Sequence, residues 1–388
     1  MRPVGSVACL CAIFLVAMNL RPGLASVSPV LPTILRDFGV GTIYGGLLTT
    51  VPVVCMGVFA PVSLRVAARL GAERTVLLSV TLVGATTLAR LWSPGPVALL
   101  VTAFAIGVGI AIAGTLLPAL AKAYFPGRVT LATGIYAIGI NLGAGCAAIG
   151  TAPVTKAIGS SWRAGLAGWS LLTLPAIVLW LPLTAQRQVA LAPRSPQLPL
   201  RSRHAWMVTG FFGAQSFVYY GILTWLATLY EELGWSRTHA GVLLALFTLL
   251  QMLGALTMSA GANRSGDLTA WIRVSAVLSI TGLVLIALVP DRAPWLWVAI
   301  LGLGVGGIFP LSLTLPLVST RTAQEAREWT SMTLGVGYLV AAAGPIAIGA
   351  LRSLTGGFGV AFVLLAAINV VIVACVPWMV PRRPTVRR

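Results

Sequence analysis

The chain has 388 residues, of which 58% are hydrophobic and only 9% are charged. Soluble proteins carry about 25% charged residues, so this composition and a mean hydropathy of +0.95 exclude a soluble globular protein and indicate a polytopic membrane protein. A net charge of +18 would point to nucleic acid in a soluble chain, but here the basic residues lie mostly between apolar stretches. They are interpreted as topology signals, and no nucleic-acid partner is expected.

Twelve apolar stretches follow one another along the chain, and each is long enough to cross a bilayer, which takes about 20 residues. They cover residues 6–34, 42–63, 74–92, 96–121, 129–151, 163–183, 204–230, 239–261, 271–289, 294–318, 329–351 and 358–380. The pattern predicts an all-α membrane protein with twelve transmembrane helices. A signal peptide is not expected, because the first apolar run continues to Leu35 and its removal would break the even number of stretches.

The basic residues predict which side of the membrane each loop occupies. With the N-terminus in the cytoplasm, 18 of the 26 basic residues lie on the cytoplasmic side, seven lie on the opposite side, and Arg21 lies within a stretch. This excess follows the positive-inside rule. Both termini are therefore expected in the cytoplasm, with the protein spanning the inner, or plasma, membrane.

Short motifs recur in the second part of the chain. Leu117-Pro118 recurs about 200 residues later as Leu315-Pro316, and several glycines recur at nearly the same offset. Repeats of like orientation predict two six-helix halves. The predicted division is an N-terminal half at 1–183, a cytoplasmic linker at 184–203 and a C-terminal half at 204–388.

Arg21 lies near the middle of the first apolar stretch. A cation at that depth costs roughly 2.5 to 3.5 kcal/mol on insertion scales, so a role that offsets this cost is expected. A negatively charged ligand is the natural candidate. The alternative is structural: Arg21 pairs with backbone carbonyls freed by Pro22, or extends its side chain toward the interface.

Four motifs connect the chain with a known family. They are Asn19-Leu20-Arg21-Pro22, Ser26-Val27-Ser28-Pro29, the run from Gly46 to Pro52 and the run from Leu116 to Leu120. With these motifs the chain resembles the major facilitator superfamily over essentially its whole length, and within it the cyanate permease and 2-nitroimidazole exporter family (CynX/NimT). The resemblance implies a central cavity between the two halves that opens alternately to either side of the membrane.

Polar and aromatic residues near the middle of six stretches are the candidates that this resemblance places at the cavity. The predicted substrate-binding residues are Asn19, Arg21, Thr49, Tyr136, Asn141, Gln215, Tyr219, Tyr220, Gln251 and Tyr338, with Thr50 beside them. Each has a structural alternative: the tyrosines pack with a satisfied hydroxyl, the amides join helices, and the threonines bond their own backbone.

Two loops resemble the signature loop of the superfamily, which follows the second helix of a half. The predicted gating-loop residues are Arg69, Gly71, Arg74, Arg264 and Gly266. The chain has Ala68 where the superfamily signature has Asp. This departure argues against the usual charge-relay contact at the inner face, though not against the fold.

The eight acidic residues all fall in predicted loops or at helix ends. We therefore expect no buried carboxylate that neutralises Arg21 or carries a proton through the core. The substrate's own charge is then the expected counter-ion, and the planar fork of Arg suits a carboxylate-like or cyanate-like anion.

Other chemistry finds little support. His204 and His239 have no partner at metal-ligand spacing, the five cysteines are scattered in apolar stretches, and no phosphate-binding Gly-Lys-Ser/Thr loop is present. Neither an enzyme, nor a metal, nor a cofactor is expected.

The sequence thus predicts a secondary transporter that carries a small monoanion by alternating access, with membrane lipid around it and a monomeric state. Two alternatives remain open. One is an exporter of neutral nitro-aromatic or other heterocyclic compounds, in which Arg21 bonds a nitro group and the tyrosines stack on the ring. The other is a passive anion channel or a transport-like sensor.

Overall fold

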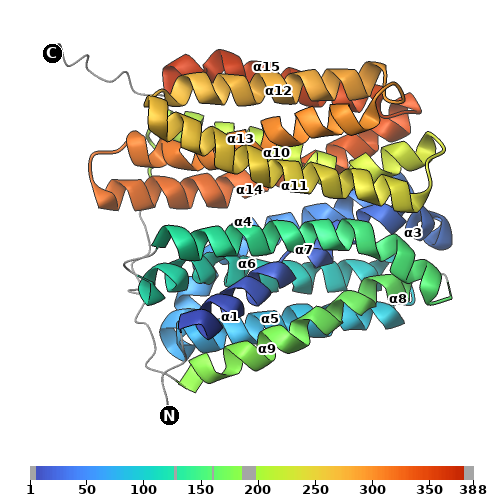
Figure 1. The fold of residues 1–388 in the computed structure, drawn as a ribbon, viewed down its shortest axis with the longest axis horizontal. Coiled ribbons are helices and arrows are strands. Elements are labelled where there is room, and N and C mark those ends of the chain that lie inside the picture. Colours follow the sequence, from blue (N-terminus) through green and yellow to red (C-terminus); the bar gives the residue numbers. More distant parts are fainter. Residues whose placement is uncertain (1–5, 126–128, 160, 186–197, 380–388) are drawn as a thin grey trace.

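All regular elements that the structure describes are helices. The structure is a computed structural model, and it describes residues 6–125, 129–159, 161–185 and 198–379. The long helices run roughly along one axis of the molecule (Figure 1). Such an arrangement suits a bilayer, because a helix satisfies its backbone hydrogen bonds internally.

The helices form two groups, which lie one above the other in Figure 1. The N-terminal group comprises α1 (Ser6–Asn19), α2 (Pro22–Ala25), η1 (Ser28–Val30), α3 (Leu31–Phe38), α4 (Thr42–Leu70), α5 (Ala72–Ala89), η2 (Arg90–Trp92), α6 (Pro96–Tyr124), α7 (Val129–Ala157), α8 (Trp162–Ala167), η3 (Gly168–Leu172), α9 (Thr173–Trp180) and η4 (Leu181–Ala185). The C-terminal group comprises α10 (Arg203–Glu232), α11 (Arg237–Ser265), α12 (Leu268–Leu288), α13 (Pro294–Val318), α14 (Ala323–Thr355) and α15 (Gly359–Met379). Most of the predicted linker, residues 186–197, lies outside the described residues.

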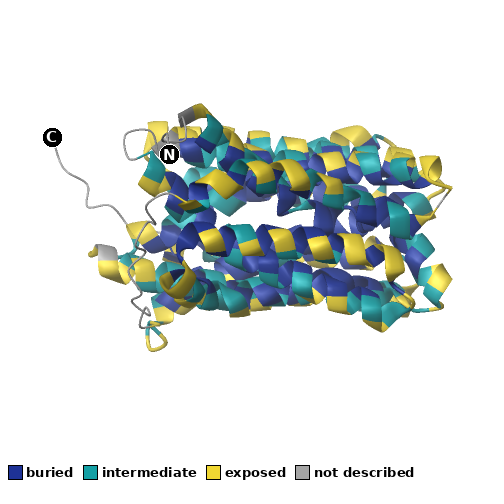
Figure 2. Cartoon of the chain, turned by 90° about the horizontal axis from the view of Figure 1, so that it is seen from below, coloured by how far each residue is buried: buried dark blue, intermediate teal, exposed yellow. Residues whose placement is uncertain are grey.

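Eleven helical stretches in the described part of the chain are long and apolar enough to cross a membrane. Their outer faces carry exposed apolar side chains such as Leu171, Val178 and Leu288, as lipid contact requires (Figure 2). The remaining predicted stretch, the seventh, exists as α10, which has 30 residues but is less apolar. It tolerates Gln215 and several aromatic side chains because nearly every residue from Phe211 to Tyr230 is buried inside the protein.

The first predicted stretch is one path across the molecule but not one helix. α1 ends at Asn19 and α2 begins at Pro22, since proline has no backbone N–H to continue the ladder and its ring clashes with the preceding turn. Short segments, α2 and η1, then lead into α3. Arg21 therefore lies at a break, where irregular backbone is tolerated only inside the protein or along a cavity.

The two groups contact each other closely along α4 and α14. A Cβ added at Gly46 would lie 2.6 Å from the carbonyl oxygen of Pro345, and one added at Gly57 would lie 2.7 Å from the carbonyl oxygen of Gly335. Glycine at these positions allows the two backbones to approach. The Thr50 hydroxyl donates a hydrogen bond of 2.5 Å across this crossing, to the carbonyl of Ala342.

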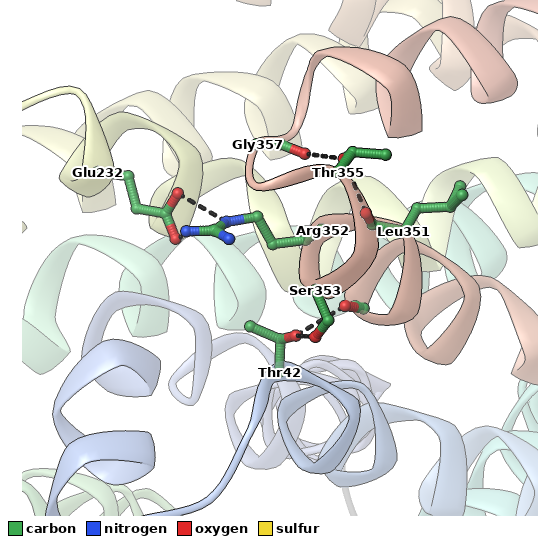
Figure 3. A network of polar contacts seen from close by, with 8 residues as sticks. Thr42, Glu232, Leu351, Arg352, Ser353, Thr355 and Gly357 are labelled. Atoms are coloured by element: carbon green, nitrogen blue, oxygen red, sulfur yellow. Dashed lines mark hydrogen bonds and ion pairs between the residues drawn. The ribbon is translucent and has the colours of Figure 1, made fainter.

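Hydrogen bonds also join α4 to α14 at the start of α4. The Thr42 hydroxyl donates to the carbonyl oxygen of Gly349 at 2.7 Å and lies 2.6 Å from the hydroxyl oxygen of Ser353 (Figure 3). Beside it, Arg352 of α14 bonds Glu232 at the end of α10, at 3.0 and 3.2 Å. These contacts lie at the end of the molecule opposite the first residue of α1 and the last residue of α15.

Candidate functional site

Arg21 is the N-cap residue of α2, at the break in the first membrane path. Its side chain is half-buried although it lies deep in the protein. Nη1 donates a hydrogen bond of 3.1 Å to the hydroxyl of Tyr220 in α10. The guanidinium carbon lies 5.7 Å from the ring centroid of Tyr219 and 5.8 Å from that of Tyr220, within the range of cation–π attraction.

Tyr220 belongs to the C-terminal group but is held from two sides by the N-terminal group. Its hydroxyl oxygen accepts from Arg21, and its proton is directed to the sulfur of Met56 in α4, 3.4 Å away. The two hydrogen bonds, from Arg21 to Tyr220 and from Tyr220 to Met56, therefore join the N-terminal and C-terminal groups. Sequence reasoning did not identify Met56.

Two further tyrosines approach Arg21 from other helices. Tyr136 of α7 and Tyr338 of α14 both interact electrostatically with the Arg21 charge. The structure thus brings together half of the predicted substrate-binding residues, namely Arg21, Tyr136, Tyr219, Tyr220 and Tyr338.

The aromatic cluster extends beyond the predicted tyrosines. The Tyr338 ring lies 6.4 Å from Tyr220 and 5.3 Å from Phe212, and Phe212 lies 6.0 Å from Phe309 of α13. Aromatic rings at these separations attract one another edge to face. Phe212 was detectable from sequence, because it precedes Tyr219 by seven residues and so shares its helix face, whereas nothing in the local sequence marks Phe309.

Arg21 has no carboxylate partner among the described residues. Their three ion pairs join Arg163 to Asp37, Arg237 to Glu231 and Arg352 to Glu232. One acidic residue differs from expectation: Glu73 at the start of α5 is only 1% exposed. Its carboxylate accepts a hydrogen bond of 2.9 Å from Tyr124 at the end of α6. This buried carboxylate therefore joins the start of α5 to the end of α6 and does not pair with Arg21.

Asn19 lies beside Arg21 in sequence but uses its amide within the N-terminal group. Its nitrogen donates to the carbonyls of Leu15 at 2.8 Å and Leu172 at 3.1 Å, and its oxygen accepts from the Thr173 hydroxyl at 3.0 Å. These bonds tie the break after α1 to the junction of η3 and α9. Asn19 therefore fixes the backbone that carries Arg21.

No hydrogen bond or ring contact between described residues joins the remaining predicted pocket residues to this cluster. Thr49 is buried on α4. Asn141 donates to the Ala137 carbonyl of its own helix at 2.8 Å. Gln215 donates to the Ser216 hydroxyl at 2.6 Å, and the side-chain oxygens of Gln215 and Gln251 are buried without a hydrogen-bond partner in the described structure.

The predicted gating loops lie at the far ends of α4 and α11. Gly71 joins α4 to α5 with φ +87°, and Gly266 caps α11 with φ +70°, two left-handed conformations that favour glycine. Arg69 and Arg264 lie in the last helical turns, where a cation complements the helix dipole, and Arg74 is exposed. Both loops therefore leave the preceding helix through a glycine of positive φ.

Comparison with known proteins agrees with this architecture. The sequence profile of the Major Facilitator Superfamily matches residues 9–342. The chain is 32% identical to the cyanate transport protein CynX of Escherichia coli (strain K12) over 90% of this chain and 91% of that protein. It is 31% identical to the 2-nitroimidazole transporter of the same organism, over 92% of this chain and 91% of that protein.

Solved structures share the fold at low sequence identity. A bacterial homologue of the human lysosomal transporter Spinster, in an inward-facing and occupied conformation, has a TM-score of 0.75 at 16% identity and is covered over 96% of both chains. The nucleoside transporter NupG has a TM-score of 0.74 at 15% identity, over 96% of this chain and 98% of that one. The profile match and the two relatives together place this multi-pass membrane protein among the transporters of the major facilitator superfamily, to which the chain belongs.

Proposed function

We propose that this transporter carries a small monoanion, such as cyanate or a small carboxylate, across the inner membrane by alternating access, with Arg21 binding the anion. The observation that carries the proposal is a half-buried guanidinium deep in the protein with no carboxylate partner in the described structure. A charge in that position needs a counter-ion, and a loaded site that is close to neutral removes most of the cost.

The contacts between the two groups support a state that is closed at one end. Thr42, Gly46 and Thr50, in the first half of α4, touch α14 toward the end of the molecule opposite the start of α1. The positive-inside rule predicts that the termini lie in the cytoplasm, and with that orientation the closed end faces outward. In this account the two halves rock about Arg21. The outer end then opens while the inner end closes.

A flux assay distinguishes this carrier from a passive channel. In proteoliposomes that contain the purified full chain, we expect anion uptake to saturate with substrate and to accelerate when the same anion is loaded on the opposite side. Both behaviours follow from a site that is exposed to one side at a time. Linear flux without acceleration would instead indicate a channel.

The tyrosine cluster favours a second candidate function, the export of neutral nitro-aromatic compounds. Two tyrosine rings lie 5.7 and 5.8 Å from the Arg21 guanidinium carbon, and two further tyrosines interact with its charge. A relative at 31% identity is a 2-nitroimidazole transporter. In that case Arg21 bonds the nitro group and the rings stack on the heterocycle. Nitroimidazole counterflow from the same proteoliposomes, without competition from anions, would favour this function.

Removing single hydroxyls separates a binding role of the tyrosines from a packing role. If Tyr219, Tyr220 and Tyr338 line the cavity, replacing each with Phe changes the KM for the transported compound several-fold and changes Tm little. We expect the largest change for Tyr220→Phe, because this hydroxyl accepts the Arg21 hydrogen bond. A lower Tm with unchanged kinetics would assign that tyrosine to packing.

The charge count predicts how transport is driven. With Arg21 as the one charge in the binding cluster, the empty site carries about one positive charge. Moving an anion into a negative-inside cell costs about 2.3 kcal/mol per 100 mV of membrane potential. We therefore expect electrogenic uniport or anion exchange rather than proton symport through a buried acid. With the membrane potential clamped at zero, an imposed pH gradient should drive no uphill accumulation of a strong-acid anion. Accumulation that is lost in a Glu231, Glu232 or His239 variant would contradict this and identify the proton site.

Glu231, just beyond the predicted 204–230 stretch, predicts a pH-dependent stability. Burial raises its pKa from 4.5 to about 7, although Arg237 and Arg36 oppose the shift, and one carboxylate oxygen is buried without a partner. A raised pKa means that the folded state binds the proton more tightly. This stabilisation is complete below about pH 4.5 and is lost as the pH rises through about 7.

The test compares two neighbouring carboxylates. Between pH 5 and pH 8 we expect the Tm of the wild type to fall more steeply than that of Glu231→Gln. The matched control is Glu232→Gln, since Glu232 is more exposed and lies 3.0 Å from its partner Arg352, whereas Glu231 lies 3.7 Å from Arg237. Equal slopes in the wild type and Glu231→Gln would contradict the assignment.

A further inference from the structure

The site around Arg21 has two chemically different sides. The cation comes from the N-terminal group, at the break between α1 and α2. The aromatic rings that continue away from it, Tyr338, Phe212 and Phe309, all belong to the C-terminal group. A ligand with a negative charge and a flat apolar body suits both sides at once.

We propose that the substrate is an aromatic monocarboxylate, whose carboxylate binds Arg21 and whose ring packs against Tyr338 and Phe309. This inference rests on the proposed anion transport and narrows it to a substrate class.

The hydrogen bonding of Arg21 supports the carboxylate. Nη1 is occupied by the Tyr220 hydroxyl, whereas no hydrogen bond from Nε or Nη2 to another described residue is present. Nε–H and one N–H of Nη2 point from the same edge of the guanidinium, at the spacing of the two oxygens of a carboxylate. The free edge of Arg21 thus offers a bidentate site, which a linear triatomic anion such as cyanate fills with only one terminal atom at a time.

The ring contacts support the aromatic body. Tyr338 and Phe309 are half-buried, while Phe212 between them is fully buried and fixes their separation. Rings so placed favour a further ring edge to face or offset, worth roughly a two- to tenfold gain in affinity beyond burial of the same apolar area. A small anion without an apolar face makes no ring contact with Tyr338 or Phe309 and contacts mainly the Arg21 guanidinium.

Bridging the two sides also fits the transport cycle. A ligand can shift a conformational equilibrium only through contacts that differ between the states. A carboxylate held by α2 with a ring held by α13 and α14 links the two groups that rock against each other. Acetate or cyanate would bind with much less effect on that motion.

The experiment measures binding of four probes to the purified full chain by ligand-dependent shifts in Tm: benzoate, cyclohexanecarboxylate, acetate and cyanate. Cyclohexanecarboxylate has the same charge and a similar size but no aromatic ring, and it is the more hydrophobic of the two acids. We expect benzoate to bind two- to tenfold tighter than cyclohexanecarboxylate and at least tenfold tighter than acetate or cyanate. Non-specific partitioning would produce the opposite order for the two cyclic acids.

Variants locate the ring site. Phe309→Leu should weaken benzoate binding severalfold and leave acetate binding unchanged, and Tyr338→Leu should weaken benzoate binding more than acetate binding. The matched control is Phe59→Leu, because Phe59 makes a similar edge contact with Phe104, 5.9 Å away, within the N-terminal group. The four wild-type affinities decide the question even where a Leu variant does not fold.

The possible failures are distinct. Equal affinities for benzoate, cyclohexanecarboxylate and acetate, or benzoate binding that neither Leu variant changes, would overturn the aromatic assignment and leave anion transport intact. Absence of binding by every anion, or benzoate binding that persists in Arg21→Ala, would overturn the proposed function itself.

Discussion

Replacing Arg21 with Ala is expected to abolish anion transport while the protein remains folded in the membrane. The change removes the only cation of the central cluster, and a hydrogen bond to a charged group contributes about 1.5 to 3 kcal/mol, so a bidentate contact accounts for a loss of about 100-fold or more. Arg21→Lys keeps the charge but loses the planar fork, and we expect it to weaken binding without abolishing transport. Initial uptake rates in proteoliposomes, normalised to the amount of reconstituted protein, measure both effects.

The control for this substitution is Arg273→Ala, which removes an exposed arginine on α12. It should transport like the wild type. Correct folding of Arg21→Ala is expected because the change relieves a cation of its insertion cost and breaks one described hydrogen bond. Wild-type uptake by Arg21→Ala would refute the assignment of Arg21 as the anion site.

Substituting Gly46 with Val is expected to reduce transport by at least tenfold. A Cβ at this position would lie 2.6 Å from the Pro345 carbonyl oxygen and 2.8 Å from the backbone of Ile346, and backbone atoms of a packed helix cannot move aside locally. α4 and α14 must then part, so the carrier cannot close at this end. The same proteoliposome assay, with Tm measured on the purified variant, gives the readout.

Gly134→Val is the matched control for Gly46→Val. Gly134 is also a helical glycine, but a Cβ there meets no atom within 4 Å. It should keep both its transport rate and its Tm. If Gly46→Val transports as fast as Gly134→Val, closure along α4 and α14 is not part of the transport cycle.

Much of the fold was predictable because a bilayer imposes strong rules on composition. The seventh stretch was predicted at 204–230 and is found as α10, Arg203–Glu232, although it is less apolar than the other helices. Its limits follow from flanking polar residues rather than from hydropathy. The profile match confirms the resemblance to the major facilitator superfamily, which rested on short motifs such as the one around Arg21.

Other features depend on tertiary packing and have no signature in the sequence. Phe309 contributes to the aromatic cluster only because α13 packs beside α10, and Met56 reaches Tyr220 from another helix. Arg90 is one of the seven basic residues that the positive-inside pattern predicts on the non-cytoplasmic side. It is completely buried, and its guanidinium nitrogens have no hydrogen-bond partner in the described structure. We have no physical account of that burial.

The break after Asn19 was only partly predictable. Pro22 predicted freed backbone carbonyls, whereas the structure shows a complete interruption between α1 and α2, tied to η3 through the Asn19 amide. A sequence does not show which distant segment supplies the second half of such a contact. For the same reason Asn19, although adjacent to Arg21, was predicted as a pocket residue and is found in a structural bond network.

Anion-dependent thermal stability tests the central role of Arg21 most directly. A ligand that binds only the folded protein stabilises it by about 2.7 kcal/mol at 100 times its Kd, so binding raises Tm. With a panel of cyanate, bicarbonate, nitrate and small carboxylates, including benzoate, at least one anion should raise the Tm of the wild type, and the same anion should leave the Tm of Arg21→Ala unchanged. An equal shift in both proteins would contradict anion binding at Arg21.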